Sequence, residues 1–195
     1  MARPEIKEAR REQVLDAFEI CVAKYGVEGA TLAKTAEQAG LARPLVRHNV
    51  GNREELISAL IERFLDRSRE KMQAFVDMLP ANDKARHAVE WLFDPQYADT
   101  HLVQVAYALI AFSADDTAMA EKMQIWVRDF EEKLASLIAD DHPQSAPEQI
   151  AAVSTGVMGI YFNFESLSVL GNADALAAPS KQAALMLLDA LDPKA

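Results

Sequence analysis

Cysteine is almost absent from this sequence, since Cys21 is the only one among 195 residues. A single cysteine cannot form a disulfide framework within the chain, and the lack of others fits a reducing compartment. The first residues carry charges but no apolar segment typical of a secretory signal. The longest weakly polar runs, near residues 102–114 and 150–164, are too short to span a bilayer. We therefore expect a cytoplasmic protein with no membrane partner.

Catalytic and metal-binding motifs are also missing. The sequence has no His-Glu-x-x-His motif, no paired-cysteine spacing and no glycine-rich loop that could cradle a phosphate. His87 and Glu90 share a helical face and could form half of a metal site, although a solvated surface pair is the simpler interpretation. We expect no enzymatic activity, no metal and no cofactor.

Strand patterns are absent, whereas apolar residues recur at helical spacing along the chain. Cys21 lies on the apolar face of the first predicted helix, which favours a buried structural thiol. The pattern predicts an all-α fold. The expected helices cover residues 6–25, 31–40, 43–49, 52–79, 82–93, 98–113, 117–139, 147–170 and 180–191.

The most informative segment begins at Thr31 and contains two short predicted helices followed by the start of a long one. Thr31 is a suitable N-cap, and Gly40 is a suitable end for the first short helix. Pro44 falls in the first turn of the second helix, where a missing N–H has no cost. Asn52 and Glu55 have the spacing of a capping box in front of an apolar run. This arrangement is typical of a helix-turn-helix with a supporting helix.

The same segment resembles the DNA-binding domain of the TetR family of transcriptional regulators. The matching features are Thr31, the run Ala39-Gly40-Leu41 at the turn, and the run from Gly51 to Leu56 that opens the long helix. Three positions depart from the family pattern: Thr35 replaces an isoleucine or valine, Arg47 a tyrosine, and Val50 a phenylalanine. The resemblance covers about the first quarter of the chain.

This resemblance implies an N-terminal three-helix DNA-binding domain and a C-terminal helical domain for ligand binding and dimerisation. We expect the first domain at residues 1–53, a linking helix at 52–79 and the second domain at 80–195. The implied function is a ligand-responsive repressor that binds a pseudo-palindromic, double-stranded DNA operator as a homodimer. A small-molecule effector, largely apolar, would release it. The alternative is a helical small-molecule-binding protein or enzyme in which the helix-turn-helix is only structural.

Charge is distributed unevenly between these regions. The net charge of −10 argues against nucleic acid at first sight. Residues 1–53 carry nine Lys and Arg against seven Asp and Glu, whereas the rest of the chain carries eleven against twenty-three. Only the N-terminal region could therefore face phosphates, and an acidic remainder would repel DNA from other approaches. Chance asymmetry in a mildly acidic protein explains the same numbers equally well.

The predicted DNA-binding residues lie mainly on the second short helix. Arginine can bond guanine, asparagine can bond adenine, and apolar side chains can contact a thymine methyl group. By analogy with the family, we expect base reading mainly from Arg43, Pro44, Leu45 and His48, with Arg47 and Asn49 beside them. Thr31 and Arg53 are expected to bind phosphates. His48 could instead cover the core of the domain.

The last two predicted helices carry apolar and small residues suited to a dimer contact. Two such helix pairs could form a four-helix bundle across a two-fold axis, as the family resemblance also implies. The same stripes could instead close the core of the single chain. The expected interface residues are Ala152, Val153, Gly156, Val157, Gly159, Ile160, Phe164, Leu167, Ala184, Leu187, Leu188 and Leu191.

An effector site is expected among the aromatic residues of the C-terminal region. Glu165 is the only Asp, Glu, Lys or Arg between Gln149 and Asp174. It must face water, a partner across the dimer, or a polar group of a ligand. The expected ligand-binding residues are Met72, Phe75, Trp91, Tyr107, Met123, Trp126, Phe130, Phe162 and Glu165.

Overall fold

The computed structural model describes residues 3–114 and 116–192 of the chain. Within these ranges it contains nine α-helices and no strand, so the predicted all-α fold is confirmed. None of the helices it describes is both long enough and apolar enough to cross a membrane.

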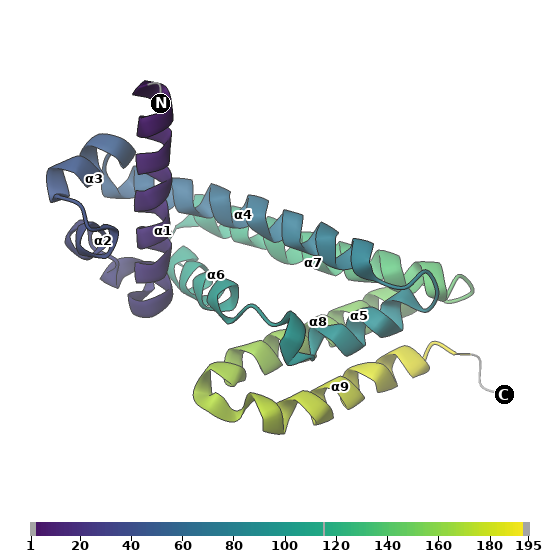
Figure 1. Cartoon of the computed structure of the whole chain (residues 1–195). Helices are drawn as coiled ribbons and strands as arrows, with labels where there is room; N and C mark the ends of the chain where they lie inside the picture. Colours follow the sequence, from purple (N-terminus) through teal and green to yellow (C-terminus); the bar gives the residue numbers. More distant parts are fainter. Residues whose placement is uncertain (1–2, 115, 193–195) are drawn as a thin grey trace. The chain divides into compact units, whose positions relative to one another are not determined.

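The helices follow the predicted order closely (Figure 1). A 3₁₀ turn, Pro95–Tyr97, precedes the sixth helix, and a π-helical turn, Ser168–Asn172, joins the last two. The predicted turn at residues 114–116 includes residue 115, which lies outside the described residues. The helices are α1 (Arg3–Gly29), α2 (Leu32–Ala39), α3 (Arg43–Val50), α4 (Arg53–Met78), α5 (Lys84–Leu92), α6 (Thr100–Ser113), α7 (Thr117–Asp141), α8 (Pro147–Leu167) and α9 (Ala173–Asp189).

The start of α9 was predicted wrongly. The sequence pattern predicts a helix only from residue 180, but α9 begins at Ala173 and contains Pro179. A proline inside a helix removes one backbone hydrogen bond and normally disfavours it. Here Leu176 and Ala177 pack against the buried core, and their burial offsets that cost.

The chain divides into two compact units, which are described separately below. Unit 1 comprises the residues up to Arg69 together with His101–Met123, and unit 2 comprises Glu70–Thr100 together with the residues from Gln124 onward. Both α4 and α7 contribute residues to each unit. The predicted domains are functional assignments: residues 1–53 are predicted to bind DNA and residues 80–195 to regulate that binding. The division into compact units does not test these assignments, and they stay predictions.

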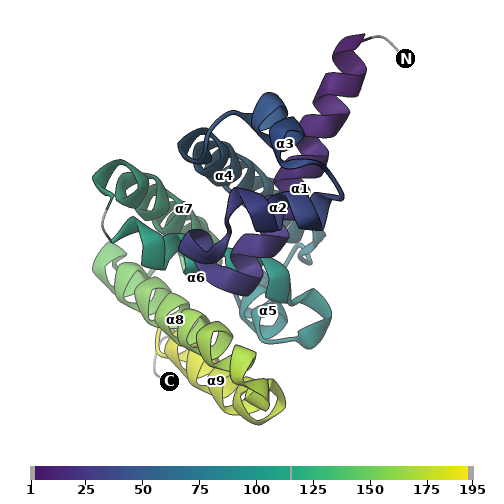
Figure 2. The same cartoon turned by 90° about the vertical axis from the view of Figure 1, so that its left-hand side faces the viewer.

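In unit 1, α2 and α3 lie beside α1 in both views (Figure 1, Figure 2). Its core is formed by side chains that are fully buried or nearly so: Val14, Phe18 and Val22 from α1, Val46 from α3, and Leu56 and Leu60 from α4. Cys21 is buried among them, as predicted, and burial raises the pKa of its thiol. The outer sides of α2 and α3 remain accessible as a binding surface.

A cluster of charged side chains ties α4 to α1 and α6 within unit 1. Arg63 forms ion pairs with Asp16 and, at 3.6 Å, with Glu19. Arg67 bonds Glu19 at 3.0 Å, and Nε2 of His101 lies 3.1 Å from the same carboxylate. Glu19 is only 9 % exposed, and a carboxylate this deeply buried needs compensating charge. The neighbouring Arg63, Arg67 and His101 can supply it. The cluster holds α4 in a defined position against α1 and α6.

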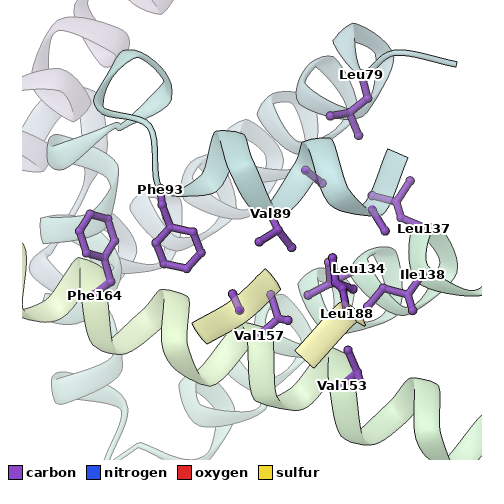
Figure 3. Close-up of a cluster of buried hydrophobic side chains, with 13 residues drawn as sticks. Leu79, Val89, Phe93, Leu134, Leu137, Ile138, Val153, Val157, Phe164 and Leu188 are labelled. Atoms are coloured by element: carbon purple, nitrogen blue, oxygen red, sulfur yellow. The ribbon is translucent and has the colours of Figure 1, made fainter. Parts of the chain in front are cut away.

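Unit 2 has its own apolar core, drawn in Figure 3. Val89 of α5, Ile138 of α7 and Val157 of α8 are fully buried in this cluster. Leu188 of α9 is 2 % exposed and belongs to it as well. In both views α8 and α9 lie side by side (Figure 1, Figure 2). Gly156 of α8 permits this approach, because an added Cβ would lie 2.8 Å from a methyl group of Leu187.

Candidate nucleic-acid interface

The turn between α2 and α3 has the predicted local structure. Oγ1 of Thr31 accepts a hydrogen bond from the Lys34 N–H at 3.3 Å, which caps α2. Gly40 adopts the left-handed conformation, with φ 64° and ψ 31°, and ends the helix. The N–H of Leu41 then bonds the Ala36 carbonyl at 2.9 Å. The predicted cap and the predicted glycine turn are confirmed.

Thr35 explains how this chain departs from the family pattern without losing the fold. Its side chain is fully buried on α2. Its hydroxyl donates a hydrogen bond to the Thr31 carbonyl at 3.0 Å. The polar group is therefore satisfied inside the helix, which removes most of the cost of burying it.

The exposed side of α3 is the centre of the candidate interface. Pro44 occupies the first turn, as predicted, and Val46 is fully buried and anchors the helix to the core. The side chains that point outward are Arg43, Pro44, Leu45, Arg47 and His48. His48 therefore does not cover the core, which was the alternative interpretation of this residue. One helix face combines two guanidinium groups, an imidazole and an apolar side chain.

Asn49 differs from the other predicted base-reading residues. It is half-buried, and its Nδ2 donates to the Leu45 carbonyl at 2.7 Å. A bond to its own helix competes with any bond to a base. Asn49 is therefore poorly prepared for reading DNA in this conformation.

The start of α4 is fixed by a capping box, as predicted. The Asn52 N–H donates to Oε2 of Glu55 at 2.7 Å, and the Glu55 N–H donates to Oδ1 of Asn52 at 2.8 Å. Gly51 precedes the box with φ 81°, and a Cβ added there would overlap the Glu55 carboxylate. These contacts fix the direction in which the chain leaves α3.

Arg53 is engaged within unit 1. Its guanidinium donates to the Val27 carbonyl at 2.9 Å and lies 5.9 Å from the centre of the Phe112 ring. The sequence places Arg53 at a helix start, which favours phosphate binding. The observed bond instead links α4 to the last turn of α1, after the break at Gly26.

The predicted dimer stripe falls partly inside the core of unit 2. Five of its residues, namely Val153, Val157, Phe164, Ala184 and Leu188, are buried in a single chain. Ala152 and Gly159 are exposed on α8, and the remaining members are partly exposed. The largest exposed apolar side chain of α9, Met186 at 62 %, was not predicted as an interface residue. Sequence spacing alone does not show that Met186 is exposed while Leu188 is buried.

The predicted effector-site residues of unit 2 form two aromatic groups. In the first, Phe75 contacts Trp91 edge-on at 6.0 Å between ring centres. In the second, Trp126 stacks on Phe162 at 5.7 Å, and Phe130 contacts Phe162 at 5.5 Å. Met72 is half-buried in the same unit. Tyr107 and Met123 belong to unit 1, so the structure does not gather all the predicted residues into one unit.

Two tyrosines extend these groups and were missed from the sequence. Tyr97 stacks on Trp91 at 4.8 Å between ring centres. Tyr161 stacks on Phe130 at 5.7 Å. The available signals were the position of Tyr161 four residues before Glu165 and that of Tyr97 after an Asp-Pro turn. Neither signal indicates which ring is stacked on which.

Glu165 is buried and does not face water. It is 6 % exposed in a single chain. Burial raises the pKa of its carboxyl group, and a hydrogen bond with Tyr161 opposes that shift. A carboxyl group in this environment favours its neutral form or a cationic partner.

The sequence is similar in part to known transcriptional regulators. No family model matches the chain. Over 65 residues, 33 % of each protein, it is 31 % identical to the HTH-type transcriptional regulator BetI of Paraburkholderia phymatum. It is 26 % identical to BetI of Stenotrophomonas maltophilia over 102 residues, 52 % of this chain and 51 % of that protein. The matches thus span a third to a half of the length of these curated relatives.

A solved structure of a TetR-family transcriptional regulator from Cytophaga hutchinsonii covers the whole chain. It aligns with a TM-score of 0.79, covering 100 % of this chain and 99 % of that one, at 12 % sequence identity. The chain therefore has the fold of TetR-family regulators.

Proposed function

We propose that this chain is a TetR-family transcriptional regulator that binds an operator in duplex DNA through α3. The observation that carries the proposal is the outward face of α3, which presents Arg43, Leu45, Arg47 and His48 together while Val46 is fully buried. An α-helix fits the major groove of DNA, and these side chains are of the kinds that recognise base edges. The partial identity to two regulators named BetI supports the same role.

Each exposed residue of α3 has a distinct proposed role. Arg43 lies at the first position of the helix and is proposed to bond a guanine. Pro44 and Leu45 provide apolar contact with a thymine methyl group, and His48 contacts a base one turn later. Arg47 is proposed to bind the DNA backbone beside them, and Thr31 to do so from the start of α2.

We propose that the protein binds as a homodimer, with one α3 in each half of a pseudo-palindromic site. Two-fold protein symmetry requires half-sites separated by about one helical turn of DNA or a small multiple of it. The buried position of Leu188 shifts the proposed contact to the exposed faces of α8 and α9, which include Gly159 and Met186.

The proposed effector is a largely apolar small molecule bound beside the aromatic groups of unit 2, which releases the protein from DNA. Aromatic walls with one polar group are typical of such sites, and Glu165 would supply that group. The ligand must bind more tightly to the conformation that does not fit DNA, and we expect α4 to transmit the change. We propose that the protein is a repressor. Its release from the operator by the effector would then allow transcription to begin.

Selection of bound sequences from a random pool of duplex DNA tests the proposal. We expect enrichment of one pseudo-palindromic sequence, bound with a steep dependence on salt concentration. Pools that remain random after repeated rounds, or binding that does not weaken with salt, would favour the alternative in which the helix-turn-helix is only structural.

A further inference from the structure

A tyrosine at the end of the first helical segment of α1 lies beneath two lysine side chains. The Tyr25 ring is 44 % exposed. Nζ of Lys34 lies 4.0 Å from its centre, and Nζ of Lys24 lies 5.1 Å from it. Both lysines are exposed, and within the described residues neither forms an ion pair with a carboxylate. Two positive charges are therefore held beside the same ring on the surface of unit 1.

The backbone explains why Tyr25 occupies this position. Gly26 follows it with φ 69° and ψ 170°, a conformation that breaks the helix. The chain then turns back, so that a Cβ added to Gly29 would lie 2.9 Å from Cβ of Tyr25. Lys34 approaches the ring from α2, where its backbone N–H is bonded to the Thr31 cap. The ring thus joins the end of one helix to the start of the next.

An aromatic ring stabilises a nearby ammonium group, and the effect is modest at an exposed site. Here one ring faces two ammonium groups, whose mutual repulsion disfavours close approach. An anion bound beside them would relieve that repulsion. The backbone of duplex DNA supplies regularly spaced anions, and lysine is a common backbone ligand. Thr31, already proposed to contact the backbone, caps the helix that carries Lys34.

We propose that Lys24, Tyr25 and Lys34 form a binding site for the phosphate backbone of duplex DNA, outside the base-reading face of α3. The two ammonium groups neutralise phosphates, and the Tyr25 ring positions them. This inference rests on the proposed function, because it assigns a further part of the same DNA interface. It adds affinity for every sequence and no preference among bases.

Titrations of the full-length protein with a selected operator and with random duplex, at several salt concentrations, test this site. Each protomer of the proposed homodimer carries one copy of each lysine, so Lys24→Ala and Lys34→Ala should each reduce the slope of log affinity against log salt by about 0.9 per protomer, or about 1.8 for the dimer. Each should weaken binding about fivefold to tenfold per protomer near 0.1 M salt, equally for both DNAs. Tyr25→Phe should bind like the wild type, whereas Tyr25→Ala should weaken binding about twofold to fivefold.

The matched control is Lys122→Ala, which removes the same charge from unit 1 at a lysine paired with Glu62 at 3.5 Å. It should leave the salt slope unchanged. Slopes for Lys24→Ala and Lys34→Ala that equal the wild-type slope, or effects no larger than that of Lys122→Ala, would overturn the site while the proposed function stands. A wild-type protein that binds no DNA would overturn both.

Discussion

At the scale of single residues, Glu165 and Gly51 have environments whose costs can be measured. Glu165 is a buried carboxyl group on α8, and Gly51 is a glycine whose backbone conformation disfavours a side chain. One lies in the proposed effector region, and the other lies directly after the proposed recognition helix. Substitutions at both positions measure how much each local environment contributes to the stability of the fold.

Glu165→Gln should stabilise the protein at neutral pH. Because burial raises the folded-state pKa of Glu165 above its usual value of 4.5, the folded protein binds the proton more tightly than the unfolded chain does. Stability is then greatest below the unfolded-state pKa and falls as pH rises through the folded-state pKa. Chemical denaturation of both proteins across pH 4–8 should give a difference that grows with pH. A difference that shrinks with rising pH would contradict the buried environment.

Gly51→Ala should destabilise unit 1 by about 1–3 kcal/mol, through strain at positive φ. It should also disrupt the capping box, because the added Cβ would overlap the Glu55 carboxylate. Gly26→Ala is the matched control, since Gly26 also has positive φ but no atom within 4 Å of an added Cβ. Thermal unfolding should show a larger loss for Gly51→Ala. Equal losses would show that the cap contributes nothing.

At the scale of helices, local signals in the sequence determined α2 and α3 well. Gly40 and Pro44 predict the turn and the next helix start because their effects act within one or two residues. The start of α9 and the burial of Leu188 could not be predicted in this way, since both depend on which helices pack together. The contact between Tyr25 and Lys34 likewise requires two chain segments to approach. The caps of the candidate interface were therefore predictable, but the bonds of Asn49 to its own helix and of Arg53 to the Val27 carbonyl were not.

Arg53 links two of these helices, and its bond to the Val27 carbonyl indicates a positioning role. Arg53→Ala should lower the free energy of unfolding by about 1–2 kcal/mol, as expected for loss of a charged hydrogen bond. It should weaken binding to all DNA sequences without changing the salt slope, because no phosphate contact is lost. Unchanged stability together with a slope reduced by about 0.9 per protomer, or about 1.8 for the dimer, would instead identify Arg53 as a direct phosphate ligand.

At the scale of the whole molecule, charge and symmetry constrain how the protein could meet DNA. Residues 54–195 carry twenty-three Asp and Glu against eleven Lys and Arg, so the net charge is positive only in the N-terminal segment, residues 1–53. A homodimer would present that segment twice, once to each half-site. In unit 2, we assign the exposed sides of α8 and α9 to the dimer contact.

Met186→Glu should convert the proposed dimer to a monomer that stays folded, because this side chain is 62 % exposed in a single chain. Leu188→Glu should instead unfold unit 2, since it places a charge in the apolar core. Sedimentation gives the oligomeric state, and circular dichroism gives the fold. Ile125→Glu, at an exposed position of α7, is the matched control. A Met186→Glu dimer of unchanged affinity would exclude this face of α9 as the contact.

The central claim is that the exposed face of α3 reads the bases of an operator. The most direct measurement compares the affinities of the wild type, Arg43→Ala and His48→Ala for the selected operator and for versions with each base pair replaced in turn. Each variant should lose about 1–3 kcal/mol of discrimination at its own base position and keep it elsewhere. If both variants discriminate at every position as the wild type does, α3 does not read the operator.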